Sequence, residues 1–282
     1  MLSDKLQQKL NRLTNNVGEL HYSGADPNEY CKNPFVAVVG TRKPTPYGKR
    51  TTETLVKELV RAGVVIVSGL AIGIDGIAHK VAVEEQGITI AVLPSGLKSI
   101  YPASHQPLAN DILRTYGTLV SEYNENHKPR KREFLERNRI IAALADAVII
   151  PEAAANSGSL NTANHAHRID IPLFAVPGQI TSPMSAGTNF LLKGRAKAIT
   201  EASDLFDLLG LSTKTPYNKS YDYMGDNEAE TLVLQKISGG ITNNHELQIA
   251  TKLPIEEFQT TATMLEIAGR IVQDETGSWR LS

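Results

Sequence analysis

From residue 35 onward, short apolar runs alternate with stretches of helical periodicity, and this alternation is the feature that most constrains the fold. Most runs are rich in Val and Ile, nearly continuous, and stopped by Gly, Ser or Pro. They are Phe35–Gly40, Val64–Ser68, Ile88–Leu93, Thr118–Ser121, Ala147–Pro151 and Leu173–Pro177. Strands buried on both faces of a parallel sheet have this pattern. With amphipathic stretches such as Thr51–Ala62 between them, the runs predict a doubly wound, mostly parallel α/β sheet.

The character of the sequence changes after residue 210. Residues 211–227 lack periodicity and are typical of a linker. Beyond them, three short helical patterns precede a terminal pair of short segments around Gly277, which predicts a winged helix. Before residue 35, Leu20–Gly24 is a candidate edge strand. We therefore expect four segments: an N-terminal extension (1–34), the α/β domain (35–210), the linker (211–227) and the winged helix (228–282).

Composition indicates a globular protein but does not identify its ligand. The chain has 282 residues, of which 41% are hydrophobic and 21% charged, as in globular proteins. Its net charge of -1 favours no polyanion, so a nucleic-acid site must come from local clustering. The single cysteine, Cys31, excludes an intramolecular disulfide and fits a reducing compartment. With neither a signal-peptide pattern nor a membrane-length apolar run, we expect a cytoplasmic protein.

The turns that follow strands are the first places to search for a site, because ligands of open α/β sheets bind there. Gly40-Thr41-Arg42 ends the first apolar run. Gly40 allows a tight turn whose amides can point at an anion, and Arg42 offers a cationic fork for phosphate. The alternative is an ordinary surface turn with a solvated arginine.

The turn after the second run is rich in small residues, including Ser68, Gly69 and Gly73. It leaves little side chain between the backbone and a ligand. The alternative is that the glycines serve tight strand–helix packing. We expect Asp75 to cap the following helix and His79 to be a core histidine rather than a catalyst. The segment is neither GxGxxG nor a Walker A loop, which argues against a nucleotide-dependent motor.

Residues 128–139 form the main electropositive segment. It contains Lys128, Arg130, Lys131, Arg132, Arg137 and Arg139, with Phe134 at its centre. Cations that follow phosphates, next to a ring on which a base can stack, are what single-strand binding requires. The alternative is a solvated charged face.

Ser157-Gly158-Ser159 lies at the expected start of a helix, where hydroxyls and free amides form a general anion site. Capping alone also explains these serines. No metal site is expected, because His165 and His167 point to different faces of a helix and Cys31 has no partner cysteine. A serine hydrolase is not supported, because the chain lacks a G-x-S-x-G elbow.

Taken in order, these segments resemble the DNA-processing (DprA/Smf) protein family. The resemblance covers roughly residues 20–210, and Leu265–Ile271 is similar to the winged helix at that family's C-terminus. The matching elements are Val38–Arg42, Ser68–His79, Gly96-Leu97 with Tyr101-Pro102, Ser121-Glu122, Arg137–Ile141, Glu152-Ala153, Ser157–Ser159, Pro177-Gly178 and Gly187-x-Asn189.

The resemblance implies a Rossmann-like domain that binds single-stranded DNA without sequence preference and self-associates as a homodimer or larger homo-oligomer. It implies protection of incoming DNA and its delivery to RecA in natural transformation, with no catalytic residue and no cofactor. In the family, residues matching Arg42 and Lys131 contact phosphate, and the aromatic matching Phe134 packs on a base. The wider expected DNA-binding set is Ser68, Gly69, Gly73, Arg130, Arg137, Asn138, Arg139, Ser157, Gly158 and Ser159.

Some residues depart from the family pattern, and two rival functions remain. Leu135 stands where the family has a proline after the aromatic, which predicts a less rigid loop at Phe134. Nucleotide hydrolases of the lysine-decarboxylase-like family share a related core, but residues 151–159 lack their Pro-Gly-Gly-x-Gly-Thr turn. A winged-helix binder of duplex DNA is the other rival. The C-terminal segment has few basic residues for that role: Lys236, Lys252, Arg270 and Arg280.

Overall fold

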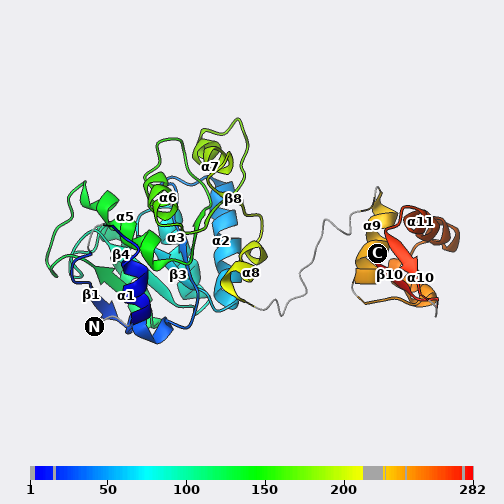
Figure 1. Ribbon diagram of the computed structural model, residues 1–282, viewed down its shortest axis with the longest axis horizontal. Helices are drawn as coiled ribbons and strands as arrows, with labels where there is room; N and C mark the ends of the chain where they lie inside the picture. Colours follow the sequence, from blue (N-terminus) through cyan, green and yellow to red (C-terminus); the bar gives the residue numbers. More distant parts are fainter. Residues whose placement is uncertain are drawn as a thin grey trace. The chain divides into compact units, whose positions relative to one another are not determined.

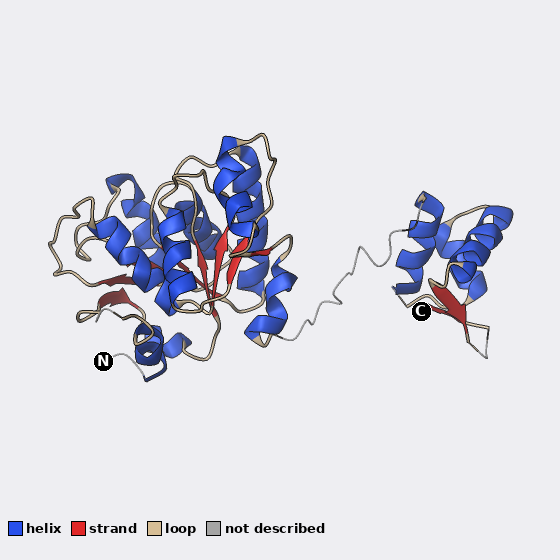
Figure 2. Cartoon of the chain, turned by 45° about the horizontal axis from the view of Figure 1, so that its top comes forward, coloured by secondary structure: helices blue, strands red, loops and turns tan. Residues whose placement is uncertain are grey.

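A computed structural model of the chain describes residues 4–14, 17–211, 225, 227–238, 240–274 and 277–281. The chain divides into two compact units, Met1–Ser212 and Thr213–Ser282 (Figures 1 and 2). Each has a hydrophobic core of its own. Of the expected linker at 211–227, residues 212–224 and 226 lie outside the described residues.

An eight-stranded sheet forms the centre of the first unit, in the order β1-β5-β4-β3-β2-β6-β7-β8. Every neighbouring pair is parallel except β1 with β5. The strands are β1 (His21–Gly24), β2 (Phe35–Val38), β3 (Val65–Ser68), β4 (Thr89–Leu93), β5 (Thr118–Ser121), β6 (Ala147–Ile150), β7 (Leu173–Ala175) and β8 (Lys197–Ala198). The mostly parallel α/β sheet predicted from the six apolar runs is confirmed.

Helices cover both faces of this sheet (Figure 2). The α-helices are α1 (Asp4–Leu10), α2 (Pro46–Arg61), α3 (Ile74–Glu84), α4 (Gln106–Arg114), α5 (Glu133–Leu144), α6 (Ser159–Arg168), α7 (Ala186–Leu192) and α8 (Phe206–Leu209). Short 3-10 helices are η1 (Pro27–Tyr30), η2 (Ala103–His105), η3 (Pro183–Ser185) and η4 (Ala202–Leu205).

Alternation along the buried strands explains why helices are needed on both faces. Val36 and Val38 of β2 pack in one core cluster with Leu55 and Leu59 of α2. Ala37 lies between them in sequence and packs in the other cluster, with residues of α5 and α6. Because successive side chains of a strand point to opposite faces, a strand that is apolar throughout must be covered twice.

The order of the strands reverses between β2 and β6. From β2 the chain builds β3, β4 and β5 on one side, and then returns to place β6, β7 and β8 on the other. The connection after β2 therefore runs toward one edge of the sheet, and the connection after β6 runs toward the other edge. Open α/β sheets bind their ligands between two such connections, at the carboxyl ends of the strands.

The described part of the N-terminal extension belongs to the same unit as the sheet. His21–Gly24 pairs antiparallel with β5, which confirms the expected edge strand. Leu6 and Leu10 of α1 are 1% and 4% exposed, and Lys9 Nζ lies 2.7 Å from Asp146 Oδ2. The expected boundary at residue 34 thus falls inside one compact unit, because α1 buries its apolar side against the core.

The described residues of the second unit form three helices and an antiparallel pair of strands. These are α9 (Glu228–Ser238), α10 (Asn244–Thr251), α11 (Ile255–Ile267), β9 (Ile271–Gln273) and β10 (Trp279–Leu281). Its core includes Leu234, Leu247, Phe258 and Trp279. The assignment of this unit as a winged helix stays a prediction. In the described part of both units, no helix combines the length and apolar character that crossing a membrane requires.

Candidate nucleic-acid interface

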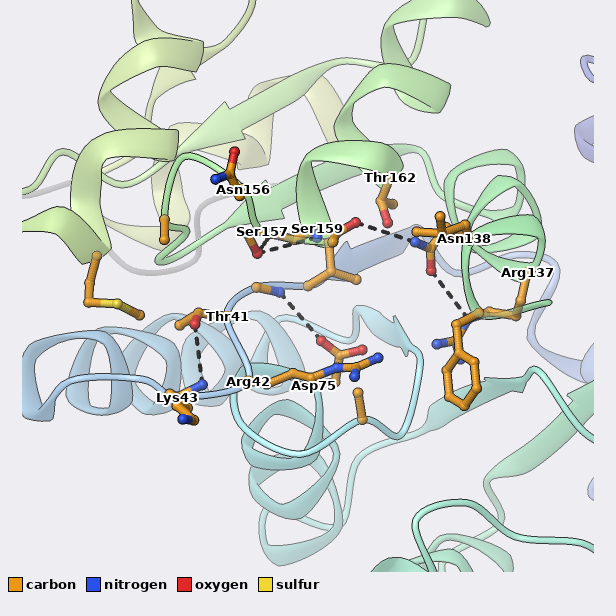
Figure 3. A pocket seen from close by; sticks show the side chains of 18 residues that line it. Thr41, Arg42, Lys43, Asp75, Arg137, Asn138, Asn156, Ser157, Ser159 and Thr162 are labelled. Carbon is orange, nitrogen blue, oxygen red and sulfur yellow. Dashed lines mark hydrogen bonds between the residues drawn. The ribbon is translucent and has the colours of Figure 1, made fainter. Parts of the chain in front are cut away.

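An open pocket of about 540 Å³ lies at the reversal point of the sheet (Figure 3). The turn after β2 and the segment between β6 and α6 form two of its walls, and the first turns of α5 add a third. Its charged and polar lining residues include Arg42, Lys43, Asp75, Arg137, Asn138, Asn156, Ser157, Ser159 and Thr162. Two of the segments selected from the sequence, the turn with Arg42 and the turn with Ser157, therefore face one cavity.

The turn that carries Arg42 is held in place by backbone contacts. Thr41 N donates to Glu152 O at 2.9 Å, and Thr41 O accepts from Ile74 N at 3.1 Å. Gly73 adopts φ +89°, and a side chain there would collide with the carbonyl oxygen of Thr41. Gly73 therefore allows α3 to begin directly beneath the turn, and the turn leaves Arg42 exposed at the rim.

Glu152 fixes the connection between this turn and α2. Its side chain is buried, and it accepts hydrogen bonds from Thr45 N at 2.8 Å and Thr45 Oγ1 at 2.6 Å. Thr45 caps the N-terminus of α2 by accepting a hydrogen bond from Gly48 N. The carboxylate at the end of β6 thus serves to position the loop that leads from Arg42 into α2.

Arg42 and two aromatic rings form a cluster at the edge of the pocket. Arg42 Cζ lies 5.6 Å from the centroid of the Phe134 ring. Tyr101 contacts Phe134 edge-on, with a centroid distance of 5.2 Å and an interplanar angle of 75°. Tyr101 is 50% exposed. A cation beside accessible aromatic surface is the combination that single-stranded nucleic acids bind.

Asp75 does not cap α3, so that expectation is wrong. The helix begins at Ile74, and Gly73 occupies the capping position. Asp75 Oδ2 instead accepts from Gly69 N at 3.1 Å, and Oδ1 lies 3.4 Å from Gly40 N. Burial raises the pKa of Asp75, and the positive charge of Arg137 opposes that rise. The Gly69 amide, expected to hold a phosphate, is already bound to this carboxylate.

Arg137 and Ser68 also belong to the floor of the site rather than to its surface. Arg137 is 4% exposed, and its Nη1 donates to Gly69 O at 2.6 Å and to Val92 O. Burial lowers its pKa to about 10. Ser68 is fully buried and donates to Val38 O at 2.6 Å. Both side chains link strand ends inside the fold, and their direct contacts with DNA stay a prediction.

Arg139 is held in an ion pair. Its Nη2 lies 2.6 and 2.8 Å from the two carboxylate oxygens of Glu122, and its side chain is only 16% exposed. An exposed cation elsewhere is a better phosphate ligand, because Arg139 would have to give up this bidentate contact. Asn138 does line the pocket, where its Nδ2 lies 3.4 Å from Gly158 O.

The turn before α6 offers hydroxyls more than free amides. Ser157 Oγ and Ser159 Oγ are 2.8 Å apart. Ser157 N already donates to Ala154 O, and Ser159 N lies 3.4 Å from Ser157 Oγ. Gly158 N alone of these three amides has no hydrogen-bond partner among the described residues. Of the free amides expected to bind an anion here, one is thus available, next to two serine hydroxyls.

Lys131 and Arg130 lie on an exposed turn just before α5 and do not line the pocket. Glu133 fixes this turn, because its Oε2 accepts from Arg130 N at 2.6 Å and lies 2.9 Å from His127 Nε2. Both cations therefore project from an anchored backbone. Phe134 follows one residue after Glu133, so the pocket edge and this turn are adjacent along α5.

Two residues of the interface were not assigned from the sequence. Lys43 follows Arg42 on the same turn and is also exposed. Tyr101 lies 33 residues before Phe134, so only the fold brings the rings together. The Tyr101-Pro102 pair was a recognisable motif, but its sequence gave no sign of an aromatic contact.

Comparison with known proteins identifies relatives over most of the chain. The family described as DNA recombination-mediator protein A matches residues 2–210. The putative DNA processing protein DprA of Mycobacterium tuberculosis is 37% identical over 251 residues, which cover 87% of this chain and 64% of that protein. The DNA processing protein DprA of Bacillus subtilis is 41% identical over 188 residues, covering 67% and 63%. The chain thus spans slightly less than two thirds of these relatives.

Solved structures also resemble this chain over most of its length. DNA processing protein A from Helicobacter pylori, whose structure addresses its single-stranded DNA binding mode, has a TM-score of 0.66 and 38% identity. That match covers 72% of this chain and 91% of the other. DprA from Streptococcus pneumoniae has a TM-score of 0.67 and 36% identity, with 73% and 71% covered.

Proposed function

Because this chain belongs to the DNA recombination-mediator protein A family, we propose that it binds single-stranded DNA at the rim of the reversal-point pocket. The observation that carries the proposal is the stack of Arg42 on Phe134, beside the polar pocket. The Helicobacter pylori relative, studied for its single-stranded DNA binding mode, supports the same ligand. We propose binding without catalysis.

Each part of the rim has a distinct role in this proposal. The planar guanidinium of Arg42 keeps its face on Phe134 while the N–H donors at its edge hold a phosphate. Lys43 and Lys131 neutralise neighbouring phosphates from either side. An unstacked base lies against the exposed surface of Phe134 and Tyr101. Every base has such a face, so binding is sequence-tolerant.

We further propose that the protein protects incoming DNA, acts as a homodimer or larger homo-oligomer, and delivers the strand to RecA during transformation or recombination. Support comes from membership of a family described as recombination mediators. An assay of RecA assembly on a strand covered by single-strand binding protein tests delivery. Acceleration by this protein is expected, and its absence would remove this role while leaving DNA binding intact.

A titration with a fluorescent single strand and its duplex tests the binding site. The wild type should prefer the single strand, and Arg42→Ala/Lys131→Ala should lose about tenfold or more in affinity, since two phosphate contacts are removed. Lys32→Ala/Lys57→Ala is the matched control, because it removes two exposed lysines that do not line the pocket. Wild-type protein that bound neither strand form would refute the proposed function. Equal losses in both double variants would refute the site.

A further inference from the structure

A second groove adjoins the reversal-point pocket on the other side of the Arg42 turn. It has a volume of about 580 Å³ and lies between the N-terminal half of α2, α3, and the segment from η2 into α4. Arg42 and Lys43 line both cavities. The turn after β2 is thus a shared wall, and a ligand that passes over it reaches either side.

The rim of the second groove is positively charged. Arg42, Lys43 and Lys49 line it, and none of them has an ion-pair partner in the part of the chain that the structure describes. By contrast, Lys57 and Arg61, further along α2, both pair with Glu85, at 3.0 and 2.9 Å. Near the start of α2, Lys49 and Arg50 are exposed and have no ion-pair partner among the described residues, and Lys49 is the one of the two that lines the groove.

The remaining charges of the groove do not cancel this potential. Lys80 lies 3.6 Å from Glu84, but the two side chains are 69% and 58% exposed, so the pair is weak and easily exchanged. The one carboxylate that lines the groove, Asp111, pairs with Arg114 Nη1 at 3.1 Å. A polyanion that entered would meet a net positive rim.

Apolar side chains line the groove beside the cations. Ile72 is 52% exposed, and Ile77 and Leu108 also contribute. His105 is a further lining residue, and its Nδ1 lies 3.0 Å from Leu70 O. A single strand places apolar base faces and charged phosphates side by side, which matches a lining of apolar and cationic side chains. A duplex stacks its bases inside and would leave Ile72 without a partner.

We propose that the single strand held at Arg42 and Phe134 continues across the turn into this second groove. Lys49 and Lys80 neutralise the phosphates that follow, and Ile72 contacts a base or sugar. This inference rests on the proposed function and extends it, because it assigns one continuous path to two cavities. Longer strands then gain contacts that a short strand bound at the first pocket cannot make.

Strand length separates the two grooves experimentally. Affinities are measured for oligothymidylates of about five and about 20 nucleotides, a range that spans typical single-strand sites. The variant Lys49→Ala/Lys80→Ala should bind the long strand roughly tenfold more weakly than the wild type and the short strand equally well. For the long strand, the slope of log affinity against log salt concentration should be shallower in this variant than in the wild type by about 1.4. The two lysines are expected to contact one phosphate each, and each lost contact lowers the slope by about 0.7. Lys32→Ala/Lys57→Ala should change neither strand.

Each outcome decides the proposal. Equal affinity of wild type and Lys49→Ala/Lys80→Ala for the long strand would overturn it, as would an equal loss for both strand lengths. A loss confined to duplex DNA would assign the groove to a duplex and also overturn the single-strand path. Failure of the wild type to bind either oligonucleotide would instead refute the proposed function itself. Thermal melting of the variants checks that these exposed substitutions leave the fold unchanged.

Discussion

Arg42 lies over the ring of Phe134, with its Cζ 5.6 Å from the ring centroid, although the two residues come from different strand–helix connections. Arg42 follows β2, and Phe134 lies in the first turn of α5. The fold thus brings a cation and an aromatic ring from two separate connections into contact. Under the proposed function, substitutions of either residue should weaken single-strand binding.

Replacing Phe134 with alanine should weaken single-strand binding about five- to 150-fold, because base–aromatic stacking is worth about 1–3 kcal/mol. Phe134→Trp keeps an aromatic face and should retain binding, whereas Phe134→Leu keeps apolar bulk only and should behave like alanine. Fluorescence anisotropy with a labelled single strand measures all three. Full affinity in Phe134→Leu would show that apolar contact, not stacking, is the contribution of this side chain.

Tyr101 should contribute to single-strand affinity through its aromatic ring rather than through its hydroxyl. An edge-on aromatic pair contributes about 0.5–1.5 kcal/mol beyond its buried area, so Tyr101→Ala should cost roughly two- to tenfold in single-strand affinity by loosening Phe134. Tyr101→Phe should be neutral. If Tyr101→Phe were as weak as Tyr101→Ala in the same titration, the hydroxyl itself would be the DNA contact.

The sheet could be predicted because its strands are encoded locally. Runs such as Phe35–Val38 are apolar at every position, and burial on both faces is the reason. The role of Asp75 could not be predicted in this way. Its partner Gly40 lies 35 residues earlier, and nothing near Asp75 in the sequence indicates that a carboxylate crosses to that turn.

The burial of Arg137 is encoded in the helical periodicity around it. In a charge run it was expected to face DNA, but it lies three, four and seven residues before Ile140, Ile141 and Leu144. That spacing places all four on one face of α5, and all four are buried. Lys131, outside the helix, is not subject to this constraint and is exposed.

Gly73 lies against the Arg42 turn and Gly158 lines the pocket, and the two glycines offer a matched pair of substitutions. Gly73→Ala combines φ +89° with a collision against Thr41 O, so it should lower stability by about 1–3 kcal/mol and weaken DNA binding by displacing the Arg42 turn. Gly158 has φ -60° and nothing within 4 Å of an added Cβ, so Gly158→Ala should change stability by less than about 0.5 kcal/mol. Denaturant unfolding measures both. Equal stability of the two variants would contradict this account of the turn.

His79 should make the stability of the first unit depend on pH. It is fully buried, and Thr89 Oγ1, 2.7 Å from its Nδ1, donates its own proton to Ile66 O. Thr89 Oγ1 therefore accepts a hydrogen bond from His79, so Nδ1 of the imidazole is protonated. The neutral ring, with its proton on Nδ1, satisfies this contact. Burial lowers the pKa of His79 from 6.5 to about 3.

Between those two values the unfolded chain binds a proton that the folded chain does not. Protonation therefore stabilises the unfolded state, and the free energy of unfolding should fall as pH drops from about 6.5 toward 3, by up to about 1.4 kcal/mol per pH unit from this group. His79→Gln should be less stable at neutral pH, but its free energy of unfolding should depend less steeply on pH over this range. His167→Gln, at an exposed position of α6, should keep the wild-type dependence. Urea unfolding at several pH values measures this, and an unchanged pH dependence in His79→Gln would assign the acid sensitivity to other groups.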